Sequence, residues 1–227
     1  DRKGKDPPPG MEGVIWGASR FHSKRPGGVP VDQDGLVAGL KGAIGGRNAE
    51  KVERIKPELA GETGPESEGY PALVRGSGRE GIPGWLCPRA KVVCTTVGPY
   101  AKYGSKLVAA CVANGTSYCD LTGEVHWMKE MIETHQEDAE ASGARIVFNC
   151  GFDCIPSDIG VYFLQKEMRA RHGEPCHEIQ LRVKGFSGAA SGGTIASMLT
   201  MLEEAEGNPA VQEAMVAPYS LNPEGEQ

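Results

Sequence analysis

The 227-residue sequence lacks an excess of positive charge and long apolar segments. Its formal net charge is −6, whereas proteins that bind nucleic acids usually present a basic surface. No apolar run approaches the ~18 residues that a membrane-spanning helix needs. Residues 1–10 are charged and proline-rich, and they are not followed by the apolar segment of a signal peptide. We therefore expect a cytoplasmic protein with no nucleic-acid partner and no membrane span.

The sequence begins with Asp1 and not with methionine, so a fragment of a longer protein is one interpretation. Met11 stands directly before the first expected strand and would be a sensible start. Glycine is about twice as frequent as the ~7% average, and much of the excess lies before residue 90. The first ninety residues therefore give the weaker structural pattern.

The seven cysteines show no spacing that is typical of a metal site. Cys150 and Cys154 are four residues apart and lack the paired close spacing of zinc ligands. Cys94, Cys111 and Cys119, like Cys150, fall within apolar strand or helix patterns, as expected of buried thiols in a reducing cytosol. The sequence therefore predicts free thiols and no metal.

Alternating strand and helix patterns predict an α/β fold with a parallel sheet. Residues 13–18 and 42–46 are short apolar runs that favour strands, and helical spacing follows over 47–61. From residue 91 the pattern sharpens, with apolar strand runs at 91–97, 116–121 and 145–150. Between them lie helical patterns at 105–114 and 124–142, which end at Gly115 and Gly143. Short connections of this kind imply right-handed crossovers and a doubly wound parallel sheet with helices on both faces.

The pattern changes after about residue 155. A helix is expected from Pro156 through Met168 to the sequence RHG, and another over 194–206. Between them, residues 177–185 alternate like a strand with one solvated face. We therefore predict a dinucleotide-binding type of domain over 11–155, loop-rich at 60–90, and a partial α+β domain over 156–227.

Polar loops follow three of the expected strands, at 95–100, 120–124 and 151–158. In an open parallel α/β sheet, ligands bind at the carboxyl ends of the strands. Glycine, proline, aspartate and serine also form turns and caps, so each loop alone has a structural explanation. Because all three fall on the same edge of one sheet, we predict a ligand crevice there.

The same residues carry a resemblance to a known family. TTVGPYAKYGSKLVAACVANGTSYCDLTGE at 95–124, GARIVFNCGFDCIPSD at 143–158 and SGGTIASML at 191–199 closely resemble saccharopine dehydrogenase-like oxidoreductases, in the branch that includes trans-acting enoyl reductases. The resemblance covers about 91–205, with weaker agreement at 13–56. It implies a Rossmann-like domain that binds NADP, followed by an α+β domain that shapes the site of a small or lipid-like substrate. It is also compatible with a homodimer and with peripheral association with membranes or lipid droplets.

The resemblance places the cofactor's phosphates at residues 17–23, where the sequence departs from the glycine fingerprint of the family. Only the first glycine is present, because Arg20 and Ser23 stand where the second and third are expected. Prolines and glycines at 26–30 should also break the helix that follows. A cofactor-deficient scaffold or interaction protein is therefore the alternative to an enzyme, and a damaged first ninety residues before a sound core is a third interpretation. The phosphate-loop candidates are Gly17, Ala18, Ser19 and Arg20.

Arg47 and Asn48 match the end of the second strand of the family, where an arginine can bind the 2′-phosphate of NADP. A solvated arginine at the start of a helix is the alternative. The nicotinamide is expected against residues 96–99, and the reaction would reduce a C=C or C=N bond. His126 and His135 are interpreted as surface or core residues and Trp127 as core. The nicotinamide contacts would be Thr96, Val97, Gly98 and Pro99, and the proton-donor candidates are Tyr100, Tyr103, Asp153 and Cys154.

Overall fold

The structure is a computed structural model. It describes the backbone of three N-terminal strands, four residues between positions 50 and 57 (Glu50, Glu53, Arg54 and Pro57), residues 86–185 and 191–223, and Gly225.

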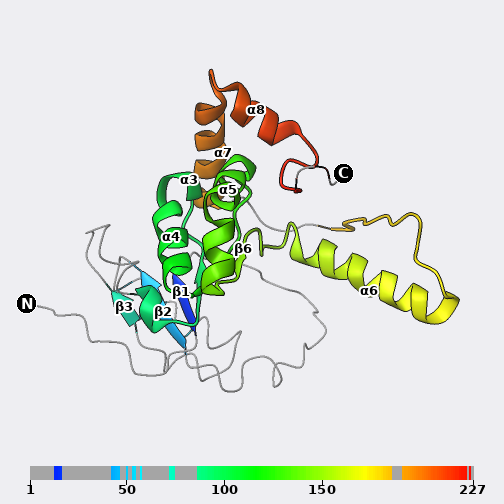
Figure 1. The fold of residues 1–227 in the computed structure, drawn as a ribbon, viewed down its shortest axis with the longest axis horizontal. Coiled ribbons are helices and arrows are strands. Elements are labelled where there is room, and N and C mark those ends of the chain that lie inside the picture. Colours follow the sequence, from blue (N-terminus) through cyan, green and yellow to red (C-terminus); the bar gives the residue numbers. More distant parts are fainter. Residues whose placement is uncertain are drawn as a thin grey trace, which may run out of the picture.

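Six parallel strands form one sheet in the order β3-β2-β1-β4-β5-β6 (Figure 1). The sequence order of the strands reverses direction across the sheet between β1 and β4, which lie side by side. The predicted α/β class and parallel sheet are thus confirmed. The strands are β1 (Gly13–Trp16), β2 (Gly42–Gly46), β3 (Ala72–Val74), β4 (Val92–Thr95), β5 (Ser117–Asp120) and β6 (Ile146–Val147).

Each of the three best-defined strand predictions is confirmed, and the observed strands are shorter than predicted. The runs 91–97, 116–121 and 145–150 contain β4, β5 and β6, which are neighbours in the sheet. Within 60–90, predicted to be loop-rich, the structure describes β3 and the short 3₁₀ helix η3 (Cys87–Arg89), and most of the other positions lie outside the described residues. The apolar sequence ALV at 72–74 is the signal that corresponds to β3.

Two helices cover one face of the sheet. The helical segments after β4 are α3 (Tyr100–Tyr103) and α4 (Ser105–Ala113), and α5 (Val125–Ser142) follows β5. α4 and α5 lie side by side (Figure 1) and pack, together with Val93 and Tyr118 from the strands, into the main core. Gly115 and Gly143 follow these helices with φ of 64° and 75°, the left-handed conformation that glycine adopts without strain. Of the helix predicted over 47–61, the structure describes Glu50, Glu53, Arg54 and Pro57, all in helical conformation, and the rest lies outside the described residues.

The core confirms some residue-level expectations. Trp127 is buried as predicted, at 1% exposure, and so is Cys111. Cys94, Cys119 and Cys150 are half-buried. All seven cysteines are free, and the described residues include no cluster that could hold a metal ion.

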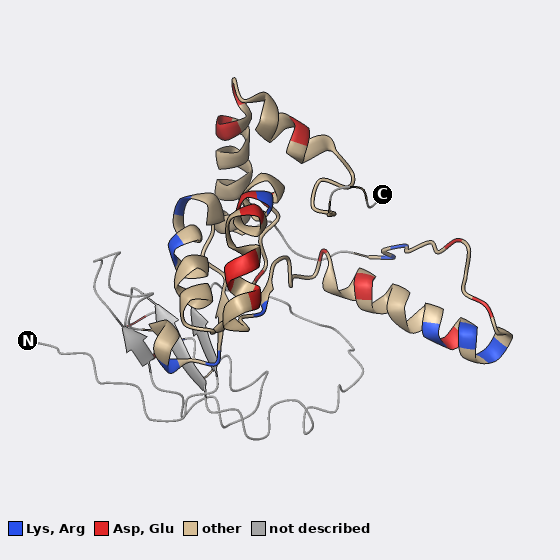
Figure 2. Ribbon diagram, viewed as in Figure 1, with Lys and Arg blue, Asp and Glu red and all other residues tan. Residues whose placement is uncertain are grey.

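The last third of the chain consists of three helices. They are α6 (Ile155–His172), α7 (Gly192–Ala205) and α8 (Pro209–Val216). α6 projects away from the sheet and buries none of its residues, whereas α7 and α8 lie against the body of the molecule (Figure 1). Basic residues gather toward the far end of α6 (Figure 2). Helices α6 and α7 were predicted, and α8 was not.

The predicted strand at 177–185 is wrong, because these residues form no regular structure. Leu181 and Val183 are 65% and 63% exposed. An alternating pattern produces a strand only where a neighbouring strand accepts its hydrogen bonds and a core covers its apolar face, and the described residues offer neither. In the part of the chain that the structure describes, no helix combines the length and apolar character needed to cross a bilayer.

Candidate functional site

The three predicted loops converge at the carboxyl ends of β4, β5 and β6. Asp120, the last residue of β5, accepts hydrogen bonds at Oδ1 from the backbone N–H groups of Thr122 (3.1 Å) and Asn149 (3.0 Å). Its backbone carbonyl accepts from Cys150 N–H at 2.7 Å. Because Asn149 and Cys150 follow β6, the second and third loops are held together at one edge of the sheet, as predicted.

Asp120 serves as an anchor for these loops and does not face a ligand. Its side chain is 1% exposed, and its Oδ2 accepts a hydrogen bond from the Tyr118 hydroxyl at 2.7 Å. Burial raises the pKa of Asp120 above its ordinary value, while the hydrogen bonds from Tyr118 and the two backbone N–H groups act in the opposite direction. Both carboxylate oxygens are thus engaged within the protein.

Glu124 joins the loop after β5 to the loop after β4. Its carboxylate is fully buried and accepts a hydrogen bond at each oxygen, from Tyr100 N–H and Ala101 N–H, both at 2.8 Å. These are the first free N–H groups of α3, which would otherwise attract an anion. The Glu124 carboxylate occupies this helix N-terminus, so a cofactor phosphate has no place there.

Helix α7 reaches the same loop from nearly a hundred residues further along the chain. A Cβ atom at Gly98 would lie 3.0 Å from Ser197 Oγ, so the backbone of Gly98 and the side chain of Ser197 are in close contact. Sequence reasoning missed Ser197 as a site residue. The only signal was the sequence SGGTIASML, which supported the resemblance without indicating a position in space.

The predicted nicotinamide contacts lie on the loop between β4 and α3. Val97 N–H donates to Thr95 Oγ1 at 3.3 Å, which holds the turn at the end of β4. Gly98 is half-buried and Pro99 is buried, with a cis peptide bond between them. Thr96 and Val97 are also half-buried, so this loop forms part of a surface that is accessible from solvent.

Tyr100, a proton-donor candidate, belongs to the core. It is 4% exposed, its ring lies 5.7 Å from that of Trp127, and its hydroxyl donates to the Thr95 carbonyl at 3.4 Å. Burial, followed by the nearby Asp120 carboxylate, raises the pKa of Tyr100. The hydroxyl is therefore directed toward the strand end and is a weak acid.

The other proton-donor candidates are more accessible. Tyr103 on α3 is 44% exposed, and Asp153 is exposed in the third loop. Cys154 is half-buried, and burial is the main cause that raises the pKa of its thiol, so the neutral form is favoured. The structure thus gives the four candidates different surroundings and leaves their roles as predictions.

The phosphate-loop and 2′-phosphate candidates fall outside the described residues. Gly17 directly follows β1, and Arg47 directly follows β2. Both strands run parallel to β4, so the carboxyl ends of the three strands lie on the same edge of the sheet. The residues concerned are Gly17, Ala18, Ser19, Arg20, Arg47 and Asn48.

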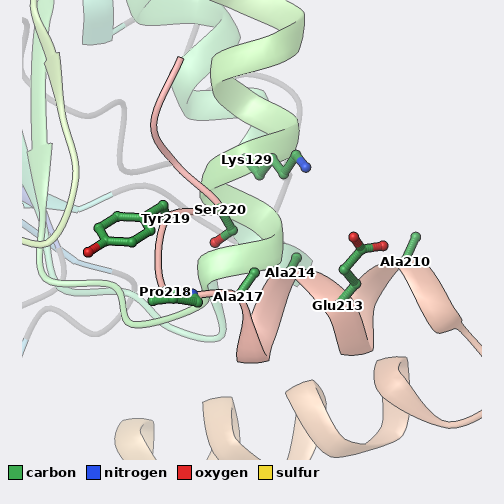
Figure 3. Close-up of a pocket in the computed structure, with 8 residues that line it drawn as sticks. All are labelled: Lys129, Ala210, Glu213, Ala214, Ala217, Pro218, Tyr219 and Ser220. Atoms are coloured by element: carbon green, nitrogen blue, oxygen red, sulfur yellow. The ribbon is translucent and has the colours of Figure 1, made fainter. Parts of the chain in front are cut away.

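A separate hollow of about 530 Å³ lies between α5 and α8 (Figure 3). Its size is in the range of ligand pockets, but none of its lining residues belongs to the three loops. Lys129 and Glu213 contribute opposite charges, and much of the remaining wall is alanine, so no set of polar groups converges on it. We therefore assign the candidate site to the sheet edge. The lining residues are Lys129, Ala210, Glu213, Ala214, Ala217, Pro218, Tyr219 and Ser220.

The chain is similar over nearly its whole length to mycobacterial proteins. It is 37% identical over 212 residues to a candidate trans-acting enoyl reductase of Mycobacterium tuberculosis, covering 93% of this chain and 49% of that protein. It is 36% identical over 211 residues to the trans-acting enoyl reductase of Mycobacterium leprae (92% and 48%) and 33% identical over 212 residues to that of Mycobacterium ulcerans (93% and 49%). The chain therefore spans about half the length of the curated relatives it matches. No protein-family model matches the chain.

Proposed function

We propose that the chain forms the Rossmann-like, cofactor-binding part of an NADP-dependent oxidoreductase that reduces the C=C bond of an enoyl substrate. The observation that carries this proposal is the convergence of three polar loops at the carboxyl edge of the parallel sheet. The names of the mycobacterial relatives supply the reaction class. Membership of the wider saccharopine dehydrogenase-like group remains part of the proposal.

The strand order supports a dinucleotide site. An order of 3-2-1-4-5-6 is that of Rossmann-type sheets, in which dinucleotides bind across the crevice where the strand order reverses. Here the reversal lies between β1 and β4, and residues 17–23 and 95–100 follow these two strands. The crevice would therefore have the phosphate-loop candidates on one side and Gly98 on the other.

The described residues fit the nicotinamide half of such a cofactor. Glu124 occupies the N-terminus of α3, so we place the pyrophosphate after β1 and the nicotinamide over residues 96–99. Gly98 presents backbone without a side chain, and the space that a Cβ would fill is bounded by Ser197 Oγ. The Tyr100 ring bounds the same space, so a flat ring would approach Gly98 from the opposite side of its backbone. Arg47 after β2 would then bind the 2′-phosphate.

The chemistry is the addition of a hydride and a proton across a C=C bond that is conjugated to a carbonyl group. A bound reduced nicotinamide supplies the hydride, with both electrons of the new C–H bond. As the β-carbon of the enoyl group takes the hydride, the π electrons of the C=C bond move to give an enolate on the substrate. A proton then adds to the α-carbon. The protein's tasks are to position the enoyl group, to stabilise charge on the carbonyl oxygen and to deliver the proton.

The protein's setting is proposed on the same basis. A small lipid-like substrate follows from the enoyl class of the relatives. The cytoplasmic location, a peripheral contact with membranes or lipid droplets, and a homodimer remain predictions from the sequence.

A second candidate function is that of a cofactor-deficient scaffold or interaction protein. Arg20 and Ser23 replace two fingerprint glycines, and α6 exposes several large apolar side chains, as binding surfaces do. Among them, Tyr162 and Phe163 are 66% and 61% exposed. The conversion of an enoyl substrate would exclude this candidate.

Fluorescence titration of the purified chain with NADPH tests the cofactor, and oxidation of NADPH with a short α,β-unsaturated acyl thioester tests the reaction. Saturable binding together with formation of the saturated thioester supports an enoyl reductase. Binding of neither compound would favour the scaffold. Oxidation of NADPH without formation of the saturated product would contradict the proposed C=C reduction.

A further inference from the structure

Helix α7 presents its apolar face to solvent and a polar face to the body of the molecule. Ile195, Met198, Leu199 and Leu202 are between 51% and 63% exposed. Ser197 is half-buried, and Thr200 is only 3% exposed. A surface helix normally buries its apolar side, so the reversed arrangement requires a reason.

The buried side of α7 places two hydroxyl groups one helical turn apart. Ser197 and Thr200 are three residues apart and therefore lie on the same side of the helix. Ser197 Oγ contacts Gly98, on the loop after β4. Neither hydroxyl makes a hydrogen bond to any residue that the structure describes. Among the described residues, His126 Nδ1 is the fully enclosed side-chain atom that lacks a partner, so both hydroxyls keep some contact with solvent and are available to a ligand.

Two polar contacts connect α7 to the body of the molecule. Glu203 lies 3.4 Å from Lys102 Nζ, and Glu204 Oε2 lies 2.7 Å from Nε2 of His126, which directly follows Val125 at the start of α5. His126 Nδ1 is buried and has no hydrogen-bond partner in the described part of the chain. The contact of α7 with the body thus contains a third unpartnered polar group and is not a dry, apolar packing surface.

We propose that Ser197 and Thr200 bind the polar end of the substrate, with the Ser197 hydroxyl donating a hydrogen bond to the acyl carbonyl oxygen. This inference rests on the proposed function, because it assumes an enoyl group above Gly98. Hydride addition to the β-carbon moves negative charge to that oxygen, and a hydroxyl donor placed there is more strongly bonded to the enolate than to the substrate. Ser197 and Thr200 are thus residues of the substrate site, and α7 is its second wall.

The test uses Ser197→Ala and Thr200→Val, with Ser142→Ala on the exposed end of α5 as the matched control. A saturated acyl thioester, the product of the proposed reaction, is titrated into each chain without cofactor and followed by isothermal titration calorimetry. NADPH is titrated separately, and circular dichroism checks that each variant is folded. We expect thioester affinity to fall about three- to tenfold in Ser197→Ala, as for the loss of one neutral hydrogen bond, and less in Thr200→Val. Ser142→Ala and all NADPH affinities should stay within about twofold.

The outcomes separate this inference from the proposed function. Equal thioester affinity in Ser197→Ala and the unaltered chain would show that Ser197 only packs against Gly98, and would overturn the inference. NADPH binding without thioester binding would also overturn it while leaving a cofactor site. Thioester binding that depends on Ser197, in a chain that does not bind NADPH, would support the inference and contradict the proposed cofactor. Binding of neither compound would overturn both.

Discussion

At the scale of single residues, two buried carboxylates define the geometry of the candidate site. Glu124 accepts two backbone N–H groups from the start of α3, and Asp120 joins the ends of β5 and β6. Neither carboxylate has a free oxygen for catalysis. These carboxylates hold the three loops together, so removing either one should lower the free energy of unfolding.

Replacing Glu124 with glutamine should destabilise the protein. The amide oxygen can accept from one backbone N–H, but the amide NH₂ faces the other, which leaves a buried donor unpaired at a cost of about 1–3 kcal/mol. Urea denaturation measures the change. Glu130→Gln, on the exposed side of α5, is the control and should change stability by less than ~0.5 kcal/mol. Equal stability of the two variants would mean that the Glu124 contacts contribute nothing.

The stability of the protein should depend on pH through Asp120, in the direction that its raised pKa sets. Because burial raises its pKa in the folded state, the folded protein holds this proton more strongly than the unfolded chain. The stabilisation that comes from this proton is fully present below the pKa of Asp120 in the unfolded chain, about 3.9. It is lost as the pH rises through the higher pKa of Asp120 in the folded protein. In urea denaturation from pH 4 upward, the unaltered chain should therefore lose stability relative to Asp120→Asn. A difference that does not vary with pH would contradict the raised pKa.

Arg47 should distinguish NADPH from NADH. It directly follows β2, where a guanidinium can pair with the 2′-phosphate that only NADP carries. Arg47→Ala should weaken NADPH binding about tenfold or more, the effect of losing one charge-assisted contact of at least ~1.4 kcal/mol, and should leave NADH binding nearly unchanged. Parallel fluorescence titrations measure both affinities. Equal losses for the two cofactors would show that Arg47 does not recognise the phosphate.

At the scale of elements, the candidate site depends on α7 lying against the loop after β4. A methyl group at position 98 would lie 3.0 Å from Ser197 Oγ, closer than ordinary contact. Gly98→Ala should therefore destabilise the protein by about 1–3 kcal/mol through overpacking. In a Ser197→Ala background, which removes Oγ, the penalty should be smaller. A double-mutant cycle by urea denaturation measures the coupling, and additive effects would mean that α7 does not contact this loop in solution.

The elements that could be predicted from the sequence are those with purely local signals. β4 and β5 are apolar runs next to glycine-terminated helices, and the order of these signals alone gives the parallel sheet. The strand predicted at 177–185 failed because an alternating pattern does not supply a partner strand. The contact between Ser197 and Gly98 was not predictable, since it spans nearly a hundred residues. The burial of Tyr100 was missed for a similar reason, because its neighbour Trp127 comes from α5, beyond α4 and β5 in the chain.

At the scale of the whole molecule, stability should reside in the sheet with α4 and α5 and not in α6. The main core consists of residues from η3, β4, α3, α4, β5 and α5, whereas α6 buries no residue. Phe163 on α6 is 61% exposed, and Val108 on α4 is fully buried. The two side chains thus report on two different parts of the molecule.

A pair of substitutions tests this division. Phe163→Gln removes a large apolar side chain that is 61% exposed, so the free energy of unfolding should change by less than ~0.5 kcal/mol. Val108→Ala removes two methyl groups from a closed core and should cost about 2–3 kcal/mol in lost burial and cavity formation. Urea denaturation of both variants, with circular dichroism to confirm helix content, provides the comparison. A large loss of stability in Phe163→Gln would mean that α6 packs against the body of the molecule in solution. In that case α6 would form a third wall of the candidate site, beside α7 and the loop after β4.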